Sequence, residues 1–363
     1  MSNIKTAPKL TELKAVIVDA EGTELTRAEE DLFKAEKPAG FILFRRNCVS
    51  KKQVKELVAA MRACVGREDI PVLIDQEGGT VARLRAPEWK EYPAAKTFGD
   101  MARQSKKAVG SSVAYDQFAS LDEAFVAARL NACQMARDMA EMGITVNCAP
   151  VVDVPAPDCH EFLSASRTYC EDPEVVGFLG EAVCRGLLEG AITPVIKHIP
   201  GHGRARVDSH LSLPVADVSH SELSATDFKP FKYLSQSDMK TALWAMAAHV
   251  VYSSLDPDSA ASISRRITDA VVRGEIGFQG VLLADDVSMK ALGGTLESRI
   301  RNTMAAGMDL TMLCNASFAD RALALSVTPK LTDAAAGRIE AAERQRVLNS
   351  GKRNDERSRS ATV

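Results

Sequence analysis

The sequence of 363 residues has little of what marks several large classes of protein. Aromatic residues make up only 5% of it, too few for a platform that stacks the bases of single-stranded nucleic acid. The 45 basic and 48 acidic residues give a net charge of −3, so there is no basic surplus for a nucleic-acid backbone or an anionic membrane. We therefore expect neither a nucleic acid nor a membrane as a partner.

Long apolar runs and paired cysteines are missing as well. No stretch of roughly 18 apolar residues occurs, so no transmembrane helix is predicted. The first residues, MSNIKTAPKLTELK, lack the apolar core of a secretory signal. The eight cysteines are scattered without a CxxC pair, and several lie within apolar runs, which indicates reduced, packed thiols. These features predict a cytoplasmic protein.

What the sequence does contain is a series of short apolar runs with helical segments between them. Most runs are continuous rather than alternating, which is typical of parallel strands covered by helices. Strands are expected near residues 15–18, 40–44, 71–74, 145–151, 194–197, 243–247, 281–284 and 309–313. Eight strands alternating with helices favour an α/β fold of the (β/α)8 TIM-barrel type, with a doubly wound open sheet as the alternative.

Local signals indicate helix boundaries and a division of the chain. The sequence from Ser120 to Glu123 is a capping-box pattern that predicts a helix start, and Asp172-Pro173 predicts another. We expect a single catalytic barrel domain over residues 1–345. The highly charged residues 346–363, which end in small polar residues, are expected to form a disordered tail.

Polar and charged side chains directly follow four of the predicted strands. These groups are Asp75-Gln76-Glu77, Lys197-His198, His249 and Asp285-Asp286. In a barrel the carboxyl ends of the strands converge on one face, and that face holds the active site. One such residue alone is better explained as a helix cap, but four groups together favour a site.

The stretch KHIPGHGRARVDSH, residues 197–210, contains further candidates. Pro200 and Gly201 interrupt any regular helix, which argues against a zincin-like pair of histidines one turn apart. In an extended loop Asp208 and His210 would project to the same side. The carboxylate could then orient an imidazole that gives and takes a proton. From these residues alone, a turn-capping aspartate beside a surface histidine is an equal alternative.

The same histidines raise the question of a metal site. Three or four ligands could come from His198, His202, Asp208, His210 and His249. However, their spacing matches no known ligand motif, and the neighbouring lysine would place a cation beside the ion. We therefore expect neither a metal nor an organic cofactor.

Several stretches together resemble glycoside hydrolase family 3, and within it the single-domain bacterial β-N-acetylhexosaminidases of peptidoglycan recycling. They are IDQEGGTVARL (74–84), SRTYCEDP (166–173), KHIPGHGRARVDSHLSLP (197–214), AAHVVYSSLDPDSAASIS (247–264) and GFQGVLLADDVSM (277–289). They occur in the family's order and spacing and span nearly the whole chain except the tail. The combination is specific, whereas a lone DQEGG would not be.

The resemblance implies roles for individual residues. Asp285, rather than its neighbour Asp286, would be the nucleophile that forms a covalent glycosyl-enzyme. Asp208 and His210 would form a dyad on a loop, with His210 as acid/base. The sugar-binding positions would be Asp75, Arg83, Arg167, Lys197, His198 and His249. Retaining glycosidases usually employ two carboxylates, so a histidine acid/base departs from the general rule.

The chain also departs from the family's pattern at two places. Thr80 stands where many relatives have arginine, and Arg204-Ala205-Arg206 replaces a more acidic sequence. The two added positive charges would tend to lower the pKa of His210, against the effect of Asp208. We expect these changes to affect aglycone preference and loop behaviour rather than to remove catalysis.

The function implied by the resemblance is exo-hydrolysis of terminal β-linked N-acetylglucosamine (GlcNAc) with retention. The expected substrates are cytoplasmic fragments of GlcNAc–1,6-anhydro-MurNAc, with or without peptide. The nearest alternative is a phosphorylase with the same covalent intermediate, because a histidine acid/base does not repel phosphate. A non-catalytic sugar-binding barrel and a metal-dependent hydrolase are the others. We expect a small-molecule carbohydrate as the partner and a monomeric chain, with a dimer as the alternative.

Overall fold

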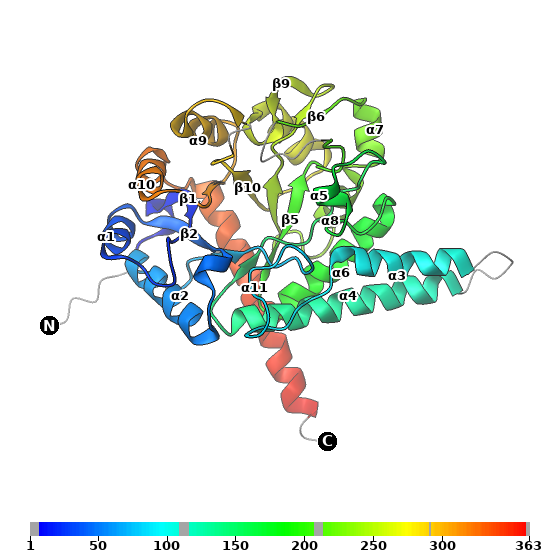
Figure 1. Ribbon diagram of the computed structural model, residues 1–363, viewed down its shortest axis with the longest axis horizontal. Helices are drawn as coiled ribbons and strands as arrows, with labels where there is room; N and C mark the ends of the chain where they lie inside the picture. Colours follow the sequence, from blue (N-terminus) through cyan, green and yellow to red (C-terminus); the bar gives the residue numbers. More distant parts are fainter. Residues whose placement is uncertain (1–6, 109–115, 207–212, 290–291, 361–363) are drawn as a thin grey trace.

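The centre of the molecule is a closed barrel of parallel strands (Figure 1). The computed structural model describes residues 7–108, 116–206, 213–289 and 292–360. Within these ranges, eight strands pair in the order β1-β11-β10-β7-β5-β4-β3-β2 and close on themselves. They are β1 (Lys14–Val18), β2 (Pro38–Leu43), β3 (Val72–Ile74), β4 (Val146–Asn147), β5 (Thr193–Ile199), β7 (Trp244–Ala247), β10 (Val281–Asp286) and β11 (Leu310–Leu313). The (β/α)8 TIM-type barrel is thereby confirmed, and the open sheet is excluded.

Each predicted strand corresponds to one barrel strand, but three of them end at least two residues before or after the predicted carboxyl end. β4 covers only two residues of the predicted 145–151. Pro150 interrupts it, because proline has no N–H to give to the ladder. β5 and β10 extend further than expected. The side chains of Lys197, His198, Asp285 and Asp286 therefore belong to the last residues of these strands rather than to the loops after them.

Helices surround the barrel and connect its strands. They are α1 (Arg27–Glu36), α2 (Lys51–Val65), α3 (Ala95–Ala108), α4 (Asp116–Ala140), α5 (Glu161–Ser164), α6 (Pro173–Glu189), α7 (His220–Ala225), α8 (Lys229–Ser235), α9 (Leu296–Ala305), α10 (Phe318–Val327) and α11 (Asp333–Ser360), with a π-helix, η4 (Ile267–Glu275), and short 3-10 turns η1 (Leu10–Glu12), η2 (Arg45–Asn47) and η3 (Ala261–Ile263). None of the described helices has the length and apolar character needed to cross a bilayer.

Two helix starts were predicted, and one prediction was wrong. α6 begins as expected, with Pro173 in its first turn and the Asp172 side chain accepting a hydrogen bond from the Glu174 amide. α4, in contrast, already begins at Asp116, so Ser120 lies inside it. A serine costs a helix interior only a few tenths of a kcal/mol, so a short capping pattern does not by itself end or begin a helix.

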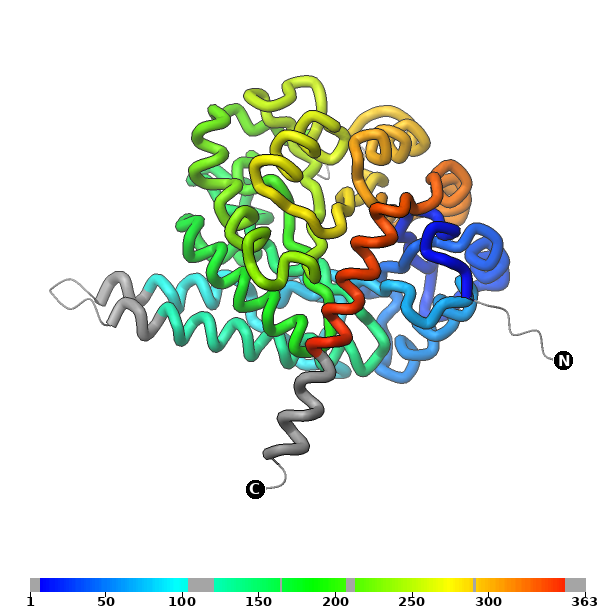
Figure 2. Tube along the Cα trace, turned by 180° about the vertical axis from the view of Figure 1, so that it is seen from behind, coloured from blue at the N-terminus to red at the C-terminus, as the bar shows by residue number. Residues whose placement is uncertain are grey.

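Two parts of the helical layer extend from the barrel. α3 and α4 lie side by side and project from its flank (Figure 1). α4 packs closely on α6, where a Cβ at Gly186 would lie 2.2 Å from the Arg129 carbonyl oxygen. Seen from behind, α11 crosses the molecule (Figure 2) and contacts β5 and β10. The disordered tail expected over residues 346–363 stays a prediction.

A small second sheet lies next to the barrel and was not predicted. It has the order β6 (Val215–Ala216), β8 (Val251–Tyr252) and β9 (Asp256–Ala260). The amide of Val251 donates to the carbonyl of Pro214 at 2.9 Å. Two of these strands have only two residues, which is too short for any hydrophobic period to be visible in the sequence.

Candidate active site

The carboxyl ends of the barrel strands enclose a pocket of about 420 Å³. Side chains from the ends of β2, β3, β5, β7, β10 and β11 line it, together with residues of the connecting loops. The predicted site residues that line it are Asp75, Arg83, Arg167, Lys197, His198 and Asp285. Residues more than 200 positions apart in the sequence thus share one cavity, at the face where barrel enzymes hold their active sites.

One wall of the pocket is a continuous chain of ion pairs. Lys197 Nζ lies 3.0 Å from Asp75 Oδ1 and 2.8 Å from Glu77 Oε1. Arg83 Nη2 lies 2.9 Å from the other oxygen of Asp75. Arg167 donates from Nε and Nη2 to both oxygens of Glu77, at 2.9 and 2.8 Å. Each carboxylate is therefore shared between two cations, which fixes all five side chains.

Mutual charge stabilisation keeps these groups ionised despite their burial. Burial alone would raise the pKa of Glu77, but the charges of Arg167 and Lys197 outweigh it and lower the pKa to about 2. Lys197 and Arg83 lower the pKa of Asp75 in the same way, against the effect of burial. For Lys197, burial favours the neutral amine, yet the two carboxylates raise its pKa. The wall therefore offers charged donors and acceptors, which suit sugar hydroxyls.

A second group on the pocket wall is organised by Asp153. Its carboxylate accepts a hydrogen bond from the His198 amide at 3.0 Å and from the His202 amide at 2.7 Å. Its other oxygen lies 2.8 Å from His198 Nδ1. Asp153 thus fixes both the backbone and one ring of this segment. The peptide bond between Lys197 and His198 is cis.

The end of β10 carries two carboxyl groups with different surroundings. Asp285 Oδ1 accepts a hydrogen bond from the Asp286 amide at 2.8 Å. Asp286 accepts from the Ser288 amide at 2.8 Å, from the Ser288 hydroxyl at 2.5 Å and from the Cys314 amide at 3.0 Å. Asp286 therefore joins the end of β10 to the end of β11, and both residues line the pocket.

His249 lies behind the pocket rather than in its lining. Its Nδ1 lies 2.6 Å from the Ser262 hydroxyl, and its Nε2 lies 3.1 Å from the carbonyl oxygen of Asp286. Only 1% of the residue is exposed. The geometry therefore gives His249 contact with the backbone of β10, and a contact with sugar stays a prediction.

Asp208 and His210 lie outside the described residues. The segment before them, residues 201–206, is held by contacts with other parts of the chain. The Tyr252 hydroxyl donates to the Gly201 carbonyl at 2.6 Å. Arg204 contacts Asp227, Glu222 and Thr226 at 2.7–2.9 Å.

Arg206 pairs with Asp158 at 2.7 Å. Both arginines that were expected to act on His210 are thus paired with carboxylates, which offset their positive charges.

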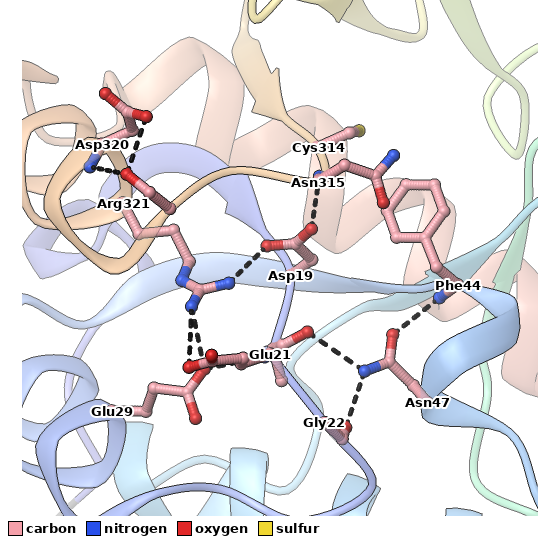
Figure 3. A network of polar contacts seen from close by, with 12 residues as sticks. Asp19, Glu21, Gly22, Glu29, Phe44, Asn47, Cys314, Asn315, Asp320 and Arg321 are labelled. Atoms are coloured by element: carbon pink, nitrogen blue, oxygen red, sulfur yellow. Dashed lines mark hydrogen bonds and ion pairs between the residues drawn. The ribbon is translucent and has the colours of Figure 1, made fainter.

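A buried polar network supports the neighbouring strand ends (Figure 3). Asp19 follows β1, and its carboxylate accepts hydrogen bonds from Arg321 Nη1 at 3.0 Å, the Asn315 amide at 2.5 Å and Arg46 Nη2 at 2.6 Å. Arg321 is 1% exposed and also lies 3.3 Å from Glu29. Because Asn315 and Cys314 both line the pocket, this network fixes its wall on the β11 side.

Two residues with a structural part in the pocket received no role from the sequence: Glu77 was only one of the strand-end candidates, and Asp153 was not singled out. Glu77 joins Arg167 to Lys197, and Asp153 holds His198. A signal was available for each, since both follow a barrel strand at its carboxyl end. Within the described residues, no group of three or more His, Cys, Asp or Glu side chains is arranged to hold a metal.

Comparison with known proteins places the chain in a family. A family model described as the glycosyl hydrolase family 3 N terminal domain matches residues 6–349. The chain therefore belongs to glycosyl hydrolase family 3 and is a glycoside hydrolase.

Similar proteins cover nearly the same length. A β-hexosaminidase from Stenotrophomonas maltophilia is 33% identical over 311 residues, which is 85% of this chain and 85% of that one. A β-hexosaminidase from Pseudomonas aeruginosa is 33% identical over 323 residues, 87% and 88% of the two chains. The crystal structure of NagZ from Neisseria gonorrhoeae in complex with N-trifluoroacetyl-D-glucosamine has a TM-score of 0.79 and 29% identity, covering 91% of this chain and 90% of that one.

Proposed function

We propose that this enzyme is a β-N-acetylhexosaminidase that removes terminal GlcNAc from the non-reducing end of its substrate, with retention of configuration. The observation that carries the proposal is the position of Asp285 in the same pocket as a wall of charged groups suited to hydroxyls. The similar proteins named β-hexosaminidase support the sugar class.

The electrostatics of Asp285 suit a nucleophile. Burial would raise the pKa of Asp285, but His249 and His198 outweigh it and lower the pKa. The carboxylate is thus ionised at neutral pH, in a residue that lines the pocket. A nucleophile of this kind attacks the anomeric carbon without prior loss of a proton.

The proposed reaction has two steps. In the first, Asp285 forms a bond to the anomeric carbon while the bond to the aglycone oxygen breaks, and His210 gives its proton to that oxygen. In the second, His210 takes a proton from water, the water oxygen bonds to the anomeric carbon, and Asp285 is released. Asp208 orients His210 and stabilises its protonated form.

The pocket wall has a separate part in this proposal. Asp75, Arg83, Arg167, Lys197 and His198 hold the hydroxyls of the terminal sugar, so that the anomeric carbon lies next to Asp285. A pocket of about 420 Å³ is of the size that holds one sugar residue with part of a second. We further propose, from the family resemblance, that the natural substrates are GlcNAc–1,6-anhydro-MurNAc fragments in the cytoplasm.

Turnover of an aryl β-N-acetylglucosaminide by the wild type and by Asp285→Ala tests the proposal. We expect a loss of several orders of magnitude in the variant, because the covalent step disappears. Asp31→Ala, which removes an exposed carboxylate on α1, is the matched control and should keep full activity. Near-normal turnover by Asp285→Ala would refute the assignment.

A second measurement tests the acid/base. His210→Ala should slow substrates with poor leaving groups far more than activated aryl substrates, because only the former need a proton. Equal losses on both would contradict the role of His210. Product analysis in phosphate buffer completes the test, since a sugar 1-phosphate in place of the free sugar would identify a phosphorylase.

A further inference from the structure

The end of β10, which carries Asp285, is held differently on its two sides. On the β11 side the backbone pairing continues to Asp286, which lies opposite Met312. On the β7 side the pairing ends with Ala284 opposite Ala247, one residue before Asp285. The part of β10 that carries the two carboxyl groups therefore extends beyond its ladder with β7.

A side chain from the segment after β7 makes a contact where this ladder ends. His249 follows Ala247 by two residues, and its Nε2 lies 3.1 Å from the carbonyl oxygen of Asp286. A carbonyl oxygen can only accept a hydrogen bond, so Nε2 carries the ring proton and is the donor. The His249 ring thus joins the segment after β7 to the end of β10, beyond the last backbone pair.

The Ser262 hydroxyl fixes this form of the ring. It lies 2.6 Å from Nδ1, which has no proton in this tautomer and therefore accepts from the hydroxyl. Ser262 is itself held, because its amide donates to the carbonyl of Ala248 at 3.1 Å. Both side chains are buried, since His249 is 1% and Ser262 0% exposed. Each ring nitrogen therefore has a partner, and the imidazole has one defined orientation.

The ring of His249 is neutral at pH 7. Burial lowers its pKa, so the imidazole is uncharged there. It gains a second proton only at acidic pH, where its positive charge favours the ionised form of Asp285. At neutral pH the effect of His249 on Asp285 therefore comes from the hydrogen bond to β10 and not from charge.

The residue that His249 holds is also the one that orients Asp285. The amide of Asp286 donates to Asp285 Oδ1 at 2.8 Å, and its carboxylate accepts from Ser288 and Cys314. The carbonyl of Asp286 is bound by His249. A shift of Asp286 would move its amide, and with it the Asp285 carboxylate. Displacements of about 1 Å in a catalytic group can cost about 100-fold in rate.

We propose that His249, fixed by Ser262, is a positioning residue that sets the orientation of the nucleophile Asp285 through the backbone of Asp286. This inference rests on the proposed function, because it takes Asp285 as the nucleophile. It requires no contact between His249 and the sugar, which agrees with the place of the ring behind the pocket.

His249→Leu and His249→Gln, assayed on an aryl β-N-acetylglucosaminide, test the proposal. Leucine has no donor, whereas the glutamine amide can donate to the Asp286 carbonyl. We expect His249→Leu to lower kcat/KM, which reports formation of the glycosyl-enzyme, by about 10- to 100-fold. His249→Gln should recover part of that loss. The inhibition constant of free GlcNAc should change by less than about threefold in both variants, because the sugar-binding side chains are unchanged.

Ser262→Ala gives a second measurement that does not depend on the folding of the His249 variants. The change removes the partner of Nδ1, so kcat/KM should fall by about three- to tenfold while GlcNAc inhibition stays the same. In the His249→Leu background it should have no further effect, because the contact is already absent. Ser235→Ala is the control and should keep full activity, since this buried serine has no hydrogen-bond partner for its hydroxyl in the described part of the chain.

Three results would each overturn the proposal. They are full activity of His249→Leu or Ser262→Ala, additive losses in the double variant, and a loss of GlcNAc binding that matches the loss of kcat/KM. The last of these would identify His249 as a sugar contact. Failure of the wild type to cleave the acetamido substrate, or normal turnover by Asp285→Ala, would instead refute the proposed function.

Discussion

Asp285 and Asp286 are neighbours in β10, yet the pKa values of their carboxyl groups are shifted in opposite directions. The pKa of Asp285 is lowered, because His249, His198, the amide of Asp286 and Lys197 together outweigh the effect of burial. Burial and the charge of Asp285 raise the pKa of Asp286 to about 6, although hydrogen bonds from Ser288 and Cys314 oppose that shift. Adjacent carboxyl groups with separated pKa values are typical of sites in which one is reactive and the other supports it.

The first prediction concerns the acidic limb of the pH profile. Asp286 is ionised above pH 6 and accepts three hydrogen bonds at the strand ends. Below that pH it gains a proton and these bonds weaken, so kcat/KM of the wild type should fall as the pH drops through about 6. Asp286→Asn cannot titrate, and its activity, although lower, should stay constant to a more acidic pH. An acidic limb at the same pH in both proteins would exclude Asp286 as its source.

The second prediction concerns Glu77, which neutralises two buried cations. Glu77→Gln removes the carboxylate that pairs with Arg167 and leaves Lys197 with Asp75, and we expect the free energy of unfolding to fall by about 3–5 kcal/mol at pH 7. The pKa of Glu77 is lower in the folded protein than in the unfolded chain, so its stabilisation is complete above pH 4.5. This stabilisation is lost as the pH falls toward about 2. The difference in unfolding free energy between wild type and variant should therefore become smaller over that range.

Urea unfolding at several pH values measures this difference. Glu56→Gln is the control, because Glu56 is 67% exposed and pairs with Lys52 at 3.8 Å on α2. Its removal should change stability little at any pH. If the two variants had equal stability at pH 7, the buried chain of ion pairs would not contribute to folding as described.

The barrel could be predicted from the sequence because its strands are continuous apolar runs at a regular spacing. Strand-end positions likewise identified Asp75, Lys197 and Asp285 as candidates. The contacts between them could not be predicted, since Lys197 and Asp75 are 122 residues apart, and Arg167 and Glu77 are 90 residues apart. Pairing between residues so far apart in the sequence depends on the closure of the barrel, which no local sequence pattern encodes.

The remaining differences have local causes. Asp153 follows a strand just as Asp75 does, but its strand is interrupted at Pro150 and ends early. Its hydrogen bonds to His198 and His202 depend on how β4 lies beside β5. The pairing of Arg204 and Arg206 with carboxylates was also not evident from the sequence, because these carboxylates lie in other segments of the chain.

The third prediction uses these two arginines as a matched pair. Arg204 is 16% exposed on its side chain and contacts Asp227, whose side chain is 1% exposed. Arg204→Met should leave that carboxylate unpaired and displace the segment that leads to Asp208 and His210. We expect kcat/KM to fall by about 10- to 100-fold, mainly through kcat, since small displacements of a catalytic group are costly.

Arg206→Met should have a much smaller effect, because the side chain of Arg206 is 74% exposed and its ion pair with Asp158 lies at the surface. Steady-state kinetics on a substrate with a poor leaving group gives the comparison, with circular dichroism to confirm folding. Similar kinetics for both variants would show that the anchoring of Arg204 does not matter for catalysis.

The last prediction concerns Gly203, where the backbone passes close to another segment. A Cβ at this position would lie 1.9 Å from the carbonyl oxygen of Val154, which is a backbone atom and cannot turn away. Gly203→Ala should therefore shift the segment from residue 201 to 206, lower stability by about 1–3 kcal/mol and reduce activity. Gly337→Ala is the control, because its added Cβ in α11 would meet no other part of the described chain within 4 Å. That change should stabilise the helix by up to about 1 kcal/mol and leave activity unchanged. Urea unfolding and turnover of the aryl substrate measure both effects, and a fully stable, fully active Gly203→Ala would show that the two segments can separate without loss.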